Sequence, residues 1–125
     1  MRLKRSRQTI LYLYNRTVGK DAEGGTYESF PESGAELRGE WWAASGKLQA
    51  DLYGQRLPYI RNIRLDEPYR TETDEKGRVF YTLLDSGETV REGDRVGLEA
   101  DRPHYRILSI RPDRFLRIEV EAVVQ

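Results

Sequence analysis

The sequence predicts a mainly β protein: a small β-barrel or sandwich with a closing C-terminal hairpin and at most one short helix. Apolar and polar residues alternate in at least four segments, which is typical of strands with one face on a core. Gly, Asp and Ser turn signals separate these segments at roughly ten-residue spacing, as in barrels and sandwiches. No segment keeps a helical period for three turns.

The first strand is expected over residues 8–18, because apolar residues occupy both of its faces. These residues are Ile10, Leu11, Tyr12, Leu13 and Tyr14. Burial on each side of the strand follows from that pattern. Glycines and charged residues at 19–25 end the strand, and a short edge strand is expected over 27–31, where a proline stops it.

A second main strand is expected over residues 36–44. One face carries Leu37, Gly39, Trp41 and Ala43, and the other carries Arg38, Glu40 and Trp42. This alternation favours Trp41 as a core anchor and Trp42 as an interface residue that contacts a partner.

Residues 45–53 have two readings. Leu48 and Leu52 are four positions apart, as on one face of a helical turn, yet Leu48, Ala50 and Leu52 also alternate as in a strand. We expect an extended or single-turn segment that stops at Gly54, and one short helix is compatible with the pattern.

The second half of the chain reads as strands and turns. A third strand is expected over 59–65, and an inserted hairpin over about 67–92 with a turn at 74–77, where Gly77 tolerates positive φ. The closing hairpin pairs 104–110 with 114–124 around a turn at 111–113. Its core-facing residues are Leu116, Ile118, Val120 and Ala122, and its water-facing residues are Arg117, Glu119 and Glu121.

Composition limits the class of protein. With 125 residues the chain is expected to form one domain, 1–125. The absence of cysteine excludes disulfides, thiolate metal sites and a cysteine nucleophile. No stretch approaches the ~20 apolar residues of a membrane span, so we expect no membrane partner and a chain made in the cytoplasm without processing.

Catalytic side chains are scarce. His104 is the single histidine, so no second histidine can share a metal, and no Ser-centred nucleophile elbow is present. His104 is therefore interpreted as a strand-entry residue bonded to backbone or solvent. The sequence predicts a protein that is not an enzyme, with no catalytic residue, cofactor or metal ion.

Charge is unevenly distributed along a chain whose net charge is zero. Residues 1–20 hold six basic groups and no acid, whereas 21–54 hold seven acids and two basic groups. Such blocks favour head-to-tail contacts between copies, a solvated tail beside an acidic loop being the alternative. The basic N-terminal arm, 1–8, is expected to bind an acidic surface of a partner subunit through Arg2, Lys4, Arg5 and Arg7. Contact with DNA phosphates is the less favoured reading, and a free tail is the alternative.

Several segments, taken in order, carry a family resemblance. They are the strand at 9–14, the loop 21–30, the stretch 45–54 with Leu52-Tyr53-Gly54, the strand 60–65, the Asp94-Arg95-Val96 turn and the final strands. Together they resemble the head-closure, or stopper, proteins of long-tailed bacteriophages, also labelled head–tail connector or minor capsid proteins. The departure is the stretch 67–92, which is longer than that family's pattern.

The resemblance implies a β-barrel subunit in a dodecameric ring at the virion neck. Its implied partners are the portal adaptor protein, a tail terminator or tail-completion protein, and packaged double-stranded DNA in the ring channel. In that family a long loop between barrel strands points into the channel. By position this loop is 44–57, with the hairpin at 67–80 as the second candidate. The candidate channel residues are Lys47, Gln49, Asp51, Tyr53, Gln55 and Arg56.

Two other classes stay open. An oligonucleotide-binding or SH3-like small barrel would use the tyrosines and arginines of the chain as one contiguous binding face. Net neutrality disfavours this class. A small hydrolase with paired carboxylates would require a concave pocket that holds an acid of raised pKa.

Overall fold

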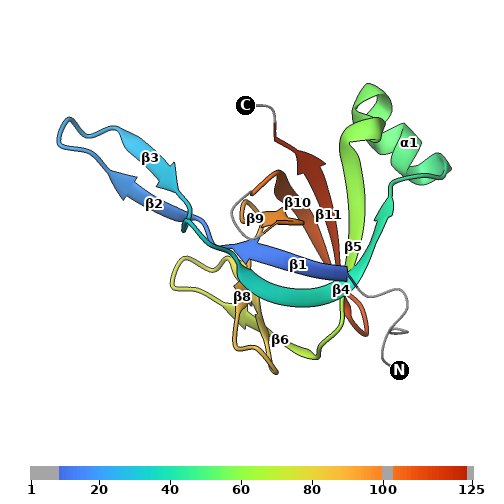
Figure 1. Ribbon diagram of the computed structural model, residues 1–125. Helices are drawn as coiled ribbons and strands as arrows, with labels where there is room; N and C mark the ends of the chain where they lie inside the picture. Colours follow the sequence, from blue (N-terminus) through green and yellow to red (C-terminus); the bar gives the residue numbers. More distant parts are fainter. Residues whose placement is uncertain (1–8, 100–102, 124–125) are drawn as a thin grey trace.

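The computed structural model describes residues 9–99 and 103–123, which form a closed antiparallel barrel with three attached elements (Figure 1). Around the barrel the order is β1 (Thr9–Tyr14), β4 (Ala35–Ala43), β5 (Ile60–Leu65), β11 (Leu116–Ala122), β10 (Tyr105–Pro112) and β9 (Arg95–Gly97), which pairs again with β1. The predicted mainly β barrel is confirmed.

The attached elements leave the barrel at different places (Figure 1). A hairpin, called the arm here, consists of β2 (Thr17–Lys20) and β3 (Thr26–Ser29) and extends away from the barrel. Helix α1 (Lys47–Tyr53) and the 3-10 helix η2 (Gly54–Tyr59) lie on the opposite side of the barrel from the arm. A three-stranded sheet is made by β6 (Tyr69–Thr73), β7 (Val79–Leu83) and β8 (Thr89–Val90).

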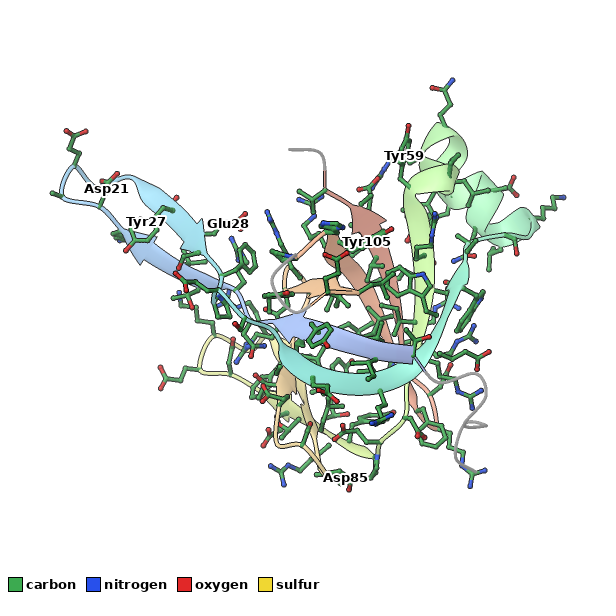
Figure 2. All side chains as sticks on the ribbon, viewed as in Figure 1. Asp21, Tyr27, Glu28, Tyr59, Asp85 and Tyr105 are labelled. Atoms are coloured by element: carbon green, nitrogen blue, oxygen red, sulfur yellow. The ribbon has the colours of Figure 1, made fainter. Side chains whose placement is uncertain are left out.

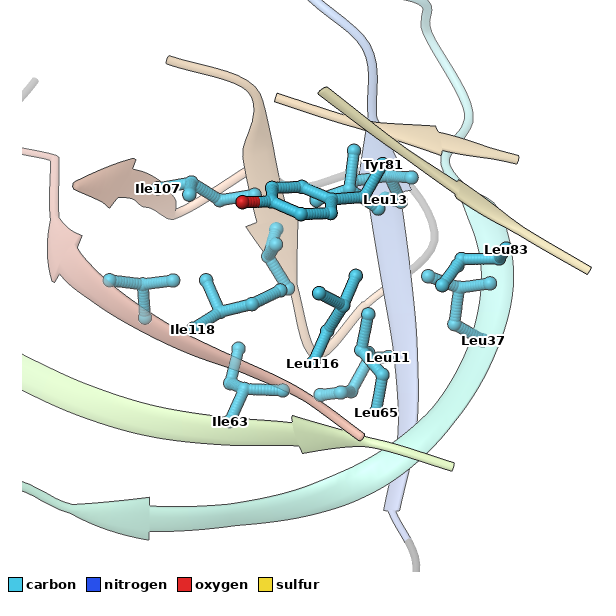
Figure 3. Packing of buried hydrophobic residues seen from close by; sticks show 13 residues of the cluster. Leu11, Leu13, Leu37, Ile63, Leu65, Tyr81, Leu83, Ile107, Leu116 and Ile118 are labelled. Carbon is cyan, nitrogen blue, oxygen red and sulfur yellow. The ribbon is translucent and has the colours of Figure 1, made fainter. Parts of the chain in front are cut away.

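The core fills the barrel and continues into the attached sheet (Figure 3). Its buried residues are Leu11, Leu13, Leu37, Ile63, Leu65, Tyr81, Leu83, Val90, Val96, Ile107, Leu116, Ile118 and Val120. Tyr81 and Leu83 come from β7, so the attached sheet shares this core. The void left inside is only about 10 Å³, no more than the space for one water. The barrel interior is therefore packed and holds no ligand cavity.

The expected first strand divides into two. β1 stays in the barrel and β2 leaves with the arm. The two residues between them, Asn15 and Arg16, are hydrogen-bonded to residues outside this strand. Asn15 Nδ2 donates to Thr89 O at 2.7 Å, and Arg16 N donates to the Asp94 carboxylate at 2.8 Å. The prediction of burial on both faces is wrong for Ile10, which is 39% exposed on the outer side of β1.

The segment expected to be extended or single-turn, with one short helix as a compatible reading, is a short helix of seven residues, α1. The short-helix reading is confirmed. Glycines bound it: Gly46 (φ 90°) precedes it and Gly54 (φ 55°) ends it. Leu48 and Leu52 do share one side, as their spacing indicated, but they are 72% and 65% exposed. Leu48 and Leu52 stay exposed because the side of α1 that carries Gln49 is the side that is hydrogen-bonded to the barrel.

The closing hairpin keeps its predicted pattern in β11, where Leu116, Ile118 and Val120 are buried in the core. Two details differ. Pro112 still pairs with Leu116, so the turn lies at 113–115 rather than at 111–113. Glu119, expected in water, is only 8% exposed, because side chains of α1 cover it.

Candidate functional site

All six candidate channel residues lie on α1 and η2. The structure divides them into two groups. Gln49, Tyr53 and Arg56 contact barrel residues through hydrogen bonds or electrostatic interactions. The side chains of Lys47, Asp51 and Gln55 are exposed. The segment is thus an ordered helical element attached to β5, β10 and β11 rather than an open loop. Whether it enters a channel stays a prediction.

Gln49 makes the main attachment of α1 to the barrel. Its Nε2 donates to Asn62 Oδ1 at 2.8 Å and to Glu119 Oε2 at 2.7 Å, and Asn62 Nδ2 donates back to Gln49 Oε1 at 3.2 Å. Ser109 Oγ donates to Glu119 Oε1 at 2.6 Å. We call Gln49, Asn62, Ser109 and Glu119 the Gln49 network. It joins α1 to three barrel strands.

Charge in the Gln49 network is stabilised by hydrogen bonds. Burial alone would raise the pKa of Glu119, but hydrogen bonds from Ser109, Gln49 and Tyr53 lower this pKa below its usual value. For the neighbouring Tyr53, burial and the Glu119 charge raise the pKa of the phenol. Glu119 is therefore a buried carboxylate that stays ionised and serves as an acceptor.

Arg56 makes a second attachment, from η2 to β11. Its Nε and Nη2 donate to the two carboxylate oxygens of Glu121 at 2.7 and 2.8 Å, a bidentate pairing. This hydrogen bond is the main reason why the pKa of Glu121 is lowered. The Arg56 guanidinium also lies 5.6 Å from the centre of the Tyr53 ring.

The attachment of α1 and η2 depends on polar contacts. Neither helix contains a buried residue, and the apolar side chains Leu48 and Leu52 are mostly exposed. A neutral hydrogen bond contributes only about 1 kcal/mol net, because water offers an alternative partner, and a bond to a charged group such as Glu119 or Glu121 contributes about 1.5–3 kcal/mol. Such an element can detach from the barrel without opening the core, which makes it suitable as a movable part.

Replacing Gln49 with alanine is expected to loosen α1 while the barrel stays folded. The change leaves Asn62 and the buried Glu119 without their shared donor, which costs about 1–3 kcal/mol in the free energy of unfolding. Hydrogen exchange of the α1 amides should speed up at least tenfold more than exchange in β11. Gln55→Ala, on exposed η2, is the matched control. Equal exchange rates in the two variants would contradict the prediction.

Acid is expected to weaken the same attachment. The folded-state pKa values of Glu119 and Glu121 are lowered, so their stabilisation is present above the unfolded value of about 4.5 and is lost as pH falls through the folded values. Amide chemical shifts of α1 and η2 should change below about pH 4.5. A Glu119→Gln/Glu121→Gln variant should flatten that change; a persistent transition there would show another cause.

The two tryptophans point to opposite faces of β4. Trp41 packs against the core and meets the Tyr105 ring edge-on, with ring centres 4.9 Å apart, as expected for a core anchor. Trp42 is half-buried on the outer face, where the Arg117 guanidinium lies 5.8 Å from its ring centre. The outer position suits an interface residue, and its partner role stays a prediction.

The basic residues of the N-terminal segment 1–8, which is not part of the β2–β3 arm, lie outside the described residues. They are Arg2, Lys4, Arg5 and Arg7. His104 has an exposed side chain just before β10. Within residues 9–99 and 103–123, no group of three or more His, Asp or Glu side chains is placed to hold a metal ion. None of the described helices has the length and apolar character needed to cross a membrane.

A surface cleft of about 600 Å³ lies between the base of the arm, β7 and the turn before β9. Its arginines are paired with acids. Arg78 and Arg91 each lie 3.2 Å from Asp74 Oδ2, and the Arg91 guanidinium stacks 4.0 Å from the Phe80 ring centre. Asp74 also accepts the backbone N–H of Arg78, the main cause of its lowered pKa. The cleft is also lined by Asp94, whose pKa is raised by burial, so it meets one requirement of the hydrolase alternative. The Asp94 carboxylate already accepts three hydrogen bonds at the base of the arm, which disfavours a catalytic role for it.

Comparison with known proteins identifies no relative of this chain. Neither protein-family models, curated proteins nor solved structures give a match. The function proposed below therefore depends on the chain's own residues and on the resemblance of its sequence pattern.

Two important features were not predicted from the sequence: the buried carboxylate of Asp94 and the arm. Asp94 is 2% exposed and accepts hydrogen bonds from Arg16 N, Arg91 N and Asn15 Nδ2, which fixes the base of the arm. Burial raises the pKa of Asp94, and these donors act in the opposite direction. In the sequence, the neighbouring Gly93 predicts a turn at Asp94 but not the burial of its carboxylate. The arm itself was read as a strand end, a loop and an edge strand.

Proposed function

We propose that this chain is a structural virion protein that forms a homo-oligomeric ring at the head–tail interface of a long-tailed bacteriophage. In this role the ring lies between the portal adaptor and the tail, closes the DNA-filled head and docks the tail. The segment 44–57 then belongs to the channel. The specific place in the virion comes from the sequence resemblance, and the arm supports the assembly role.

The main support for assembly is the exposure of the arm. Seven of its eight strand residues are exposed. Val18 and Tyr27 are each 53% exposed and lie on opposite faces, because Val18 pairs with Glu28 whereas Tyr27 pairs with Gly19. A two-stranded hairpin without a core of its own is at best marginally stable in water. Contact with a neighbouring subunit would supply the missing packing.

The base of the arm, in contrast, is firmly held. Glu28 accepts from Arg16 Nε at 2.6 Å and lies 3.6 Å from Arg95 Nη2, while the Arg95 guanidinium stacks 4.4 Å from the Phe30 ring centre. The hydrogen bond with Arg16 is the main cause of the lowered pKa of Glu28. A fixed base and an exposed tip suit an arm that reaches a neighbouring molecule.

The barrel and α1 suit the same role. A packed barrel interior provides a rigid scaffold without a ligand site, and α1 is held by polar contacts that can be released. A channel element must move aside when DNA passes, so individually weak contacts are what a removable closure requires.

The test is the intact particle together with a deletion. In the particle each copy should bury on the order of 1,000 Å² or more against its neighbours. Replacing 44–57 with a short Gly-Ser linker should leave the barrel folded, as judged by circular dichroism, and let DNA leak from tailless heads. A second variant that shortens the β6–β7 turn at 74–77 tests the competing channel candidate in the same assay. Particles without contact between copies would overturn the ring, and unchanged DNA retention would remove the closing role.

The alternative of a nucleic-acid-binding barrel receives less support. It expects tyrosines and arginines on one contiguous face. The exposed tyrosines Tyr27 and Tyr59 instead lie on the arm and on η2, at opposite sides of the barrel (Figure 2).

A further inference from the structure

Three arginines stand directly opposite one another on the outer face of the barrel. Arg111 of β10 pairs in register with Arg117 of β11, which pairs on its other side with Arg64 of β5. Neighbouring strands are only about 4.8 Å apart, and like charges directly opposite destabilise a sheet. We call Arg64, Arg111 and Arg117 the arginine row. Glu40 of β4 flanks the row beside Arg64, so the excess of positive charge lies at Arg111 and Arg117.

Aromatic rings hold two members of the row in place. The Arg117 guanidinium lies 5.8 Å from the Trp42 ring centre, and that of Arg64 lies 5.3 Å from the Phe115 ring centre. Three acids lie near the row. Glu40 of β4 is the register partner of Arg64, and Glu119 interacts electrostatically with Arg111. Asp113 lies 4.0 Å from Arg117 in an exposed ion pair that contributes little. Beside the row is a hollow of about 230 Å³ that is lined by Trp42 and Leu48 and by three members of the Gln49 network. The surface thus combines positive charge with an aromatic and an aliphatic side chain and a polar floor.

The arm tip has the complementary character. Asp21 and Glu23 are exposed there, and Glu23 has no ion pair among the described contacts. Asp21 Oδ1 accepts from the backbone N–H groups of Glu23 and Gly25, which fixes the loop. The Tyr27 ring lies over Gly19, so close that a Cβ at this glycine would be 2.6 Å from ring atoms. Tyr27 is therefore an exposed but fixed aromatic side chain beside two acids.

We propose that the arm of one copy binds the arginine row of the next copy, with Glu23 and Asp21 facing Arg111 and Arg117. The Tyr27 ring then packs on the hollow beside Trp42. Tyrosine, tryptophan and arginine are the side chains that most often dominate interface energies.

The arm and the arginine row cannot meet within one molecule. The arm extends from one side of the barrel, and strands β5 and β11 with α1 lie on the other (Figure 1). A contact between two different patches is heterologous, so repeated copies form a ring or a filament. This inference rests on the proposed ring for closure and adds which two surfaces form its subunit contact. An aromatic anchor beside the acids favours a second copy over a nucleic-acid backbone.

Cross-linking tests the contact, because the chain contains no cysteine. One protein carries Glu23→Cys and another carries Arg111→Cys, and the two are mixed at high concentration and in assembled particles with a short bifunctional thiol reagent. The expected product joins one protein to the other at least tenfold more than either to itself. Glu75→Cys, at the tip of the β6–β7 turn, replaces Glu23→Cys in the control. Equal yields with that control, or no cross-link in the particle, would overturn the proposal.

Charge reversal provides the second measurement. Glu23→Arg should weaken self-association about tenfold, and Arg111→Glu in the same chain should restore it. Binding of a 20-base-pair DNA duplex is measured in parallel: strong binding that Arg117→Gln abolishes, without the cross-link, would assign the row to nucleic acid and overturn the proposal. Particles whose copies touch elsewhere would refute this contact but keep the ring, whereas particles without contacts between copies would refute both.

Discussion

Gly39→Ala is expected to destabilise the barrel strongly, by about 3 kcal/mol. Gly39 is buried in β4 and pairs with Thr9 on one side and Leu65 on the other. A Cβ at this position would lie 2.5 Å from the backbone oxygen of Arg64 and 3.2 Å from Leu11 Cδ1. A backbone atom cannot rotate away as a side chain can, so β4 and β5 must move apart and strain the closed barrel.

Thermal unfolding measures this effect. For a domain of this size the loss corresponds to roughly 10 °C in Tm. Arg38→Ala is the matched control, because Arg38 is the preceding residue of the same strand and its side chain is exposed. A Tm of the Gly39→Ala protein within about 2 °C of the control would mean that the barrel opens at this seam at little cost.

Gly39 also illustrates what the sequence could predict. Its alternation with Leu37 and Trp41 assigned it to the inward face of a strand, and that assignment is confirmed. A glycine inside a strand often marks a close approach of another backbone. The identity of that backbone, Arg64 in β5, depends on the register between two strands that are far apart in the sequence. Periodicity within a strand does not contain this information.

The helix α1 shows where periodicity misleads. The spacing of Leu48 and Leu52 fits a helical turn and correctly places them on one side, but burial of apolar residues is the usual assumption. Here Gln49 is the residue that faces the barrel, because Asn62 and Glu119 present polar groups at that point of the outer surface. Their juxtaposition arises from the pairing of β5 with β11, so the local sequence could not reveal it.

The charge pattern was informative in a coarser way. It separated a basic start, residues 1–20, from an acidic segment, residues 21–54, that includes the tip and β3 of the arm, and this favoured contacts between copies. It did not reveal the arginine row, because Arg64, Arg111 and Arg117 are dispersed along the chain and gather only when β5, β11 and β10 pair. Whether the arm meets that row is decided by the cross-link, not by the fold.

Asp94→Asn is expected to cost about 2–3 kcal/mol and to loosen the base of the arm. The Asp94 carboxylate accepts three hydrogen bonds: from Arg16 N at 2.8 Å, Arg91 N at 3.0 Å and Asn15 Nδ2 at 3.1 Å. An amide of the same shape offers one acceptor oxygen and turns an N–H₂ group toward a donor. At least one buried donor then loses its partner, and such a group costs about 1–3 kcal/mol.

Two measurements separate the global and local parts of this effect. Urea unfolding should give the loss of stability, and hydrogen exchange should show faster exchange of the Arg16 and Arg91 amides than of amides in β11. Glu92→Gln, an exposed carboxylate in the same turn, should change neither. If the arm depends on Asp94 for its direction, Asp94→Asn should also weaken assembly under conditions where the barrel remains folded. Unchanged exchange at Arg16 would mean that the Arg16–Glu28 and Arg95–Glu28 contacts are enough to orient the arm.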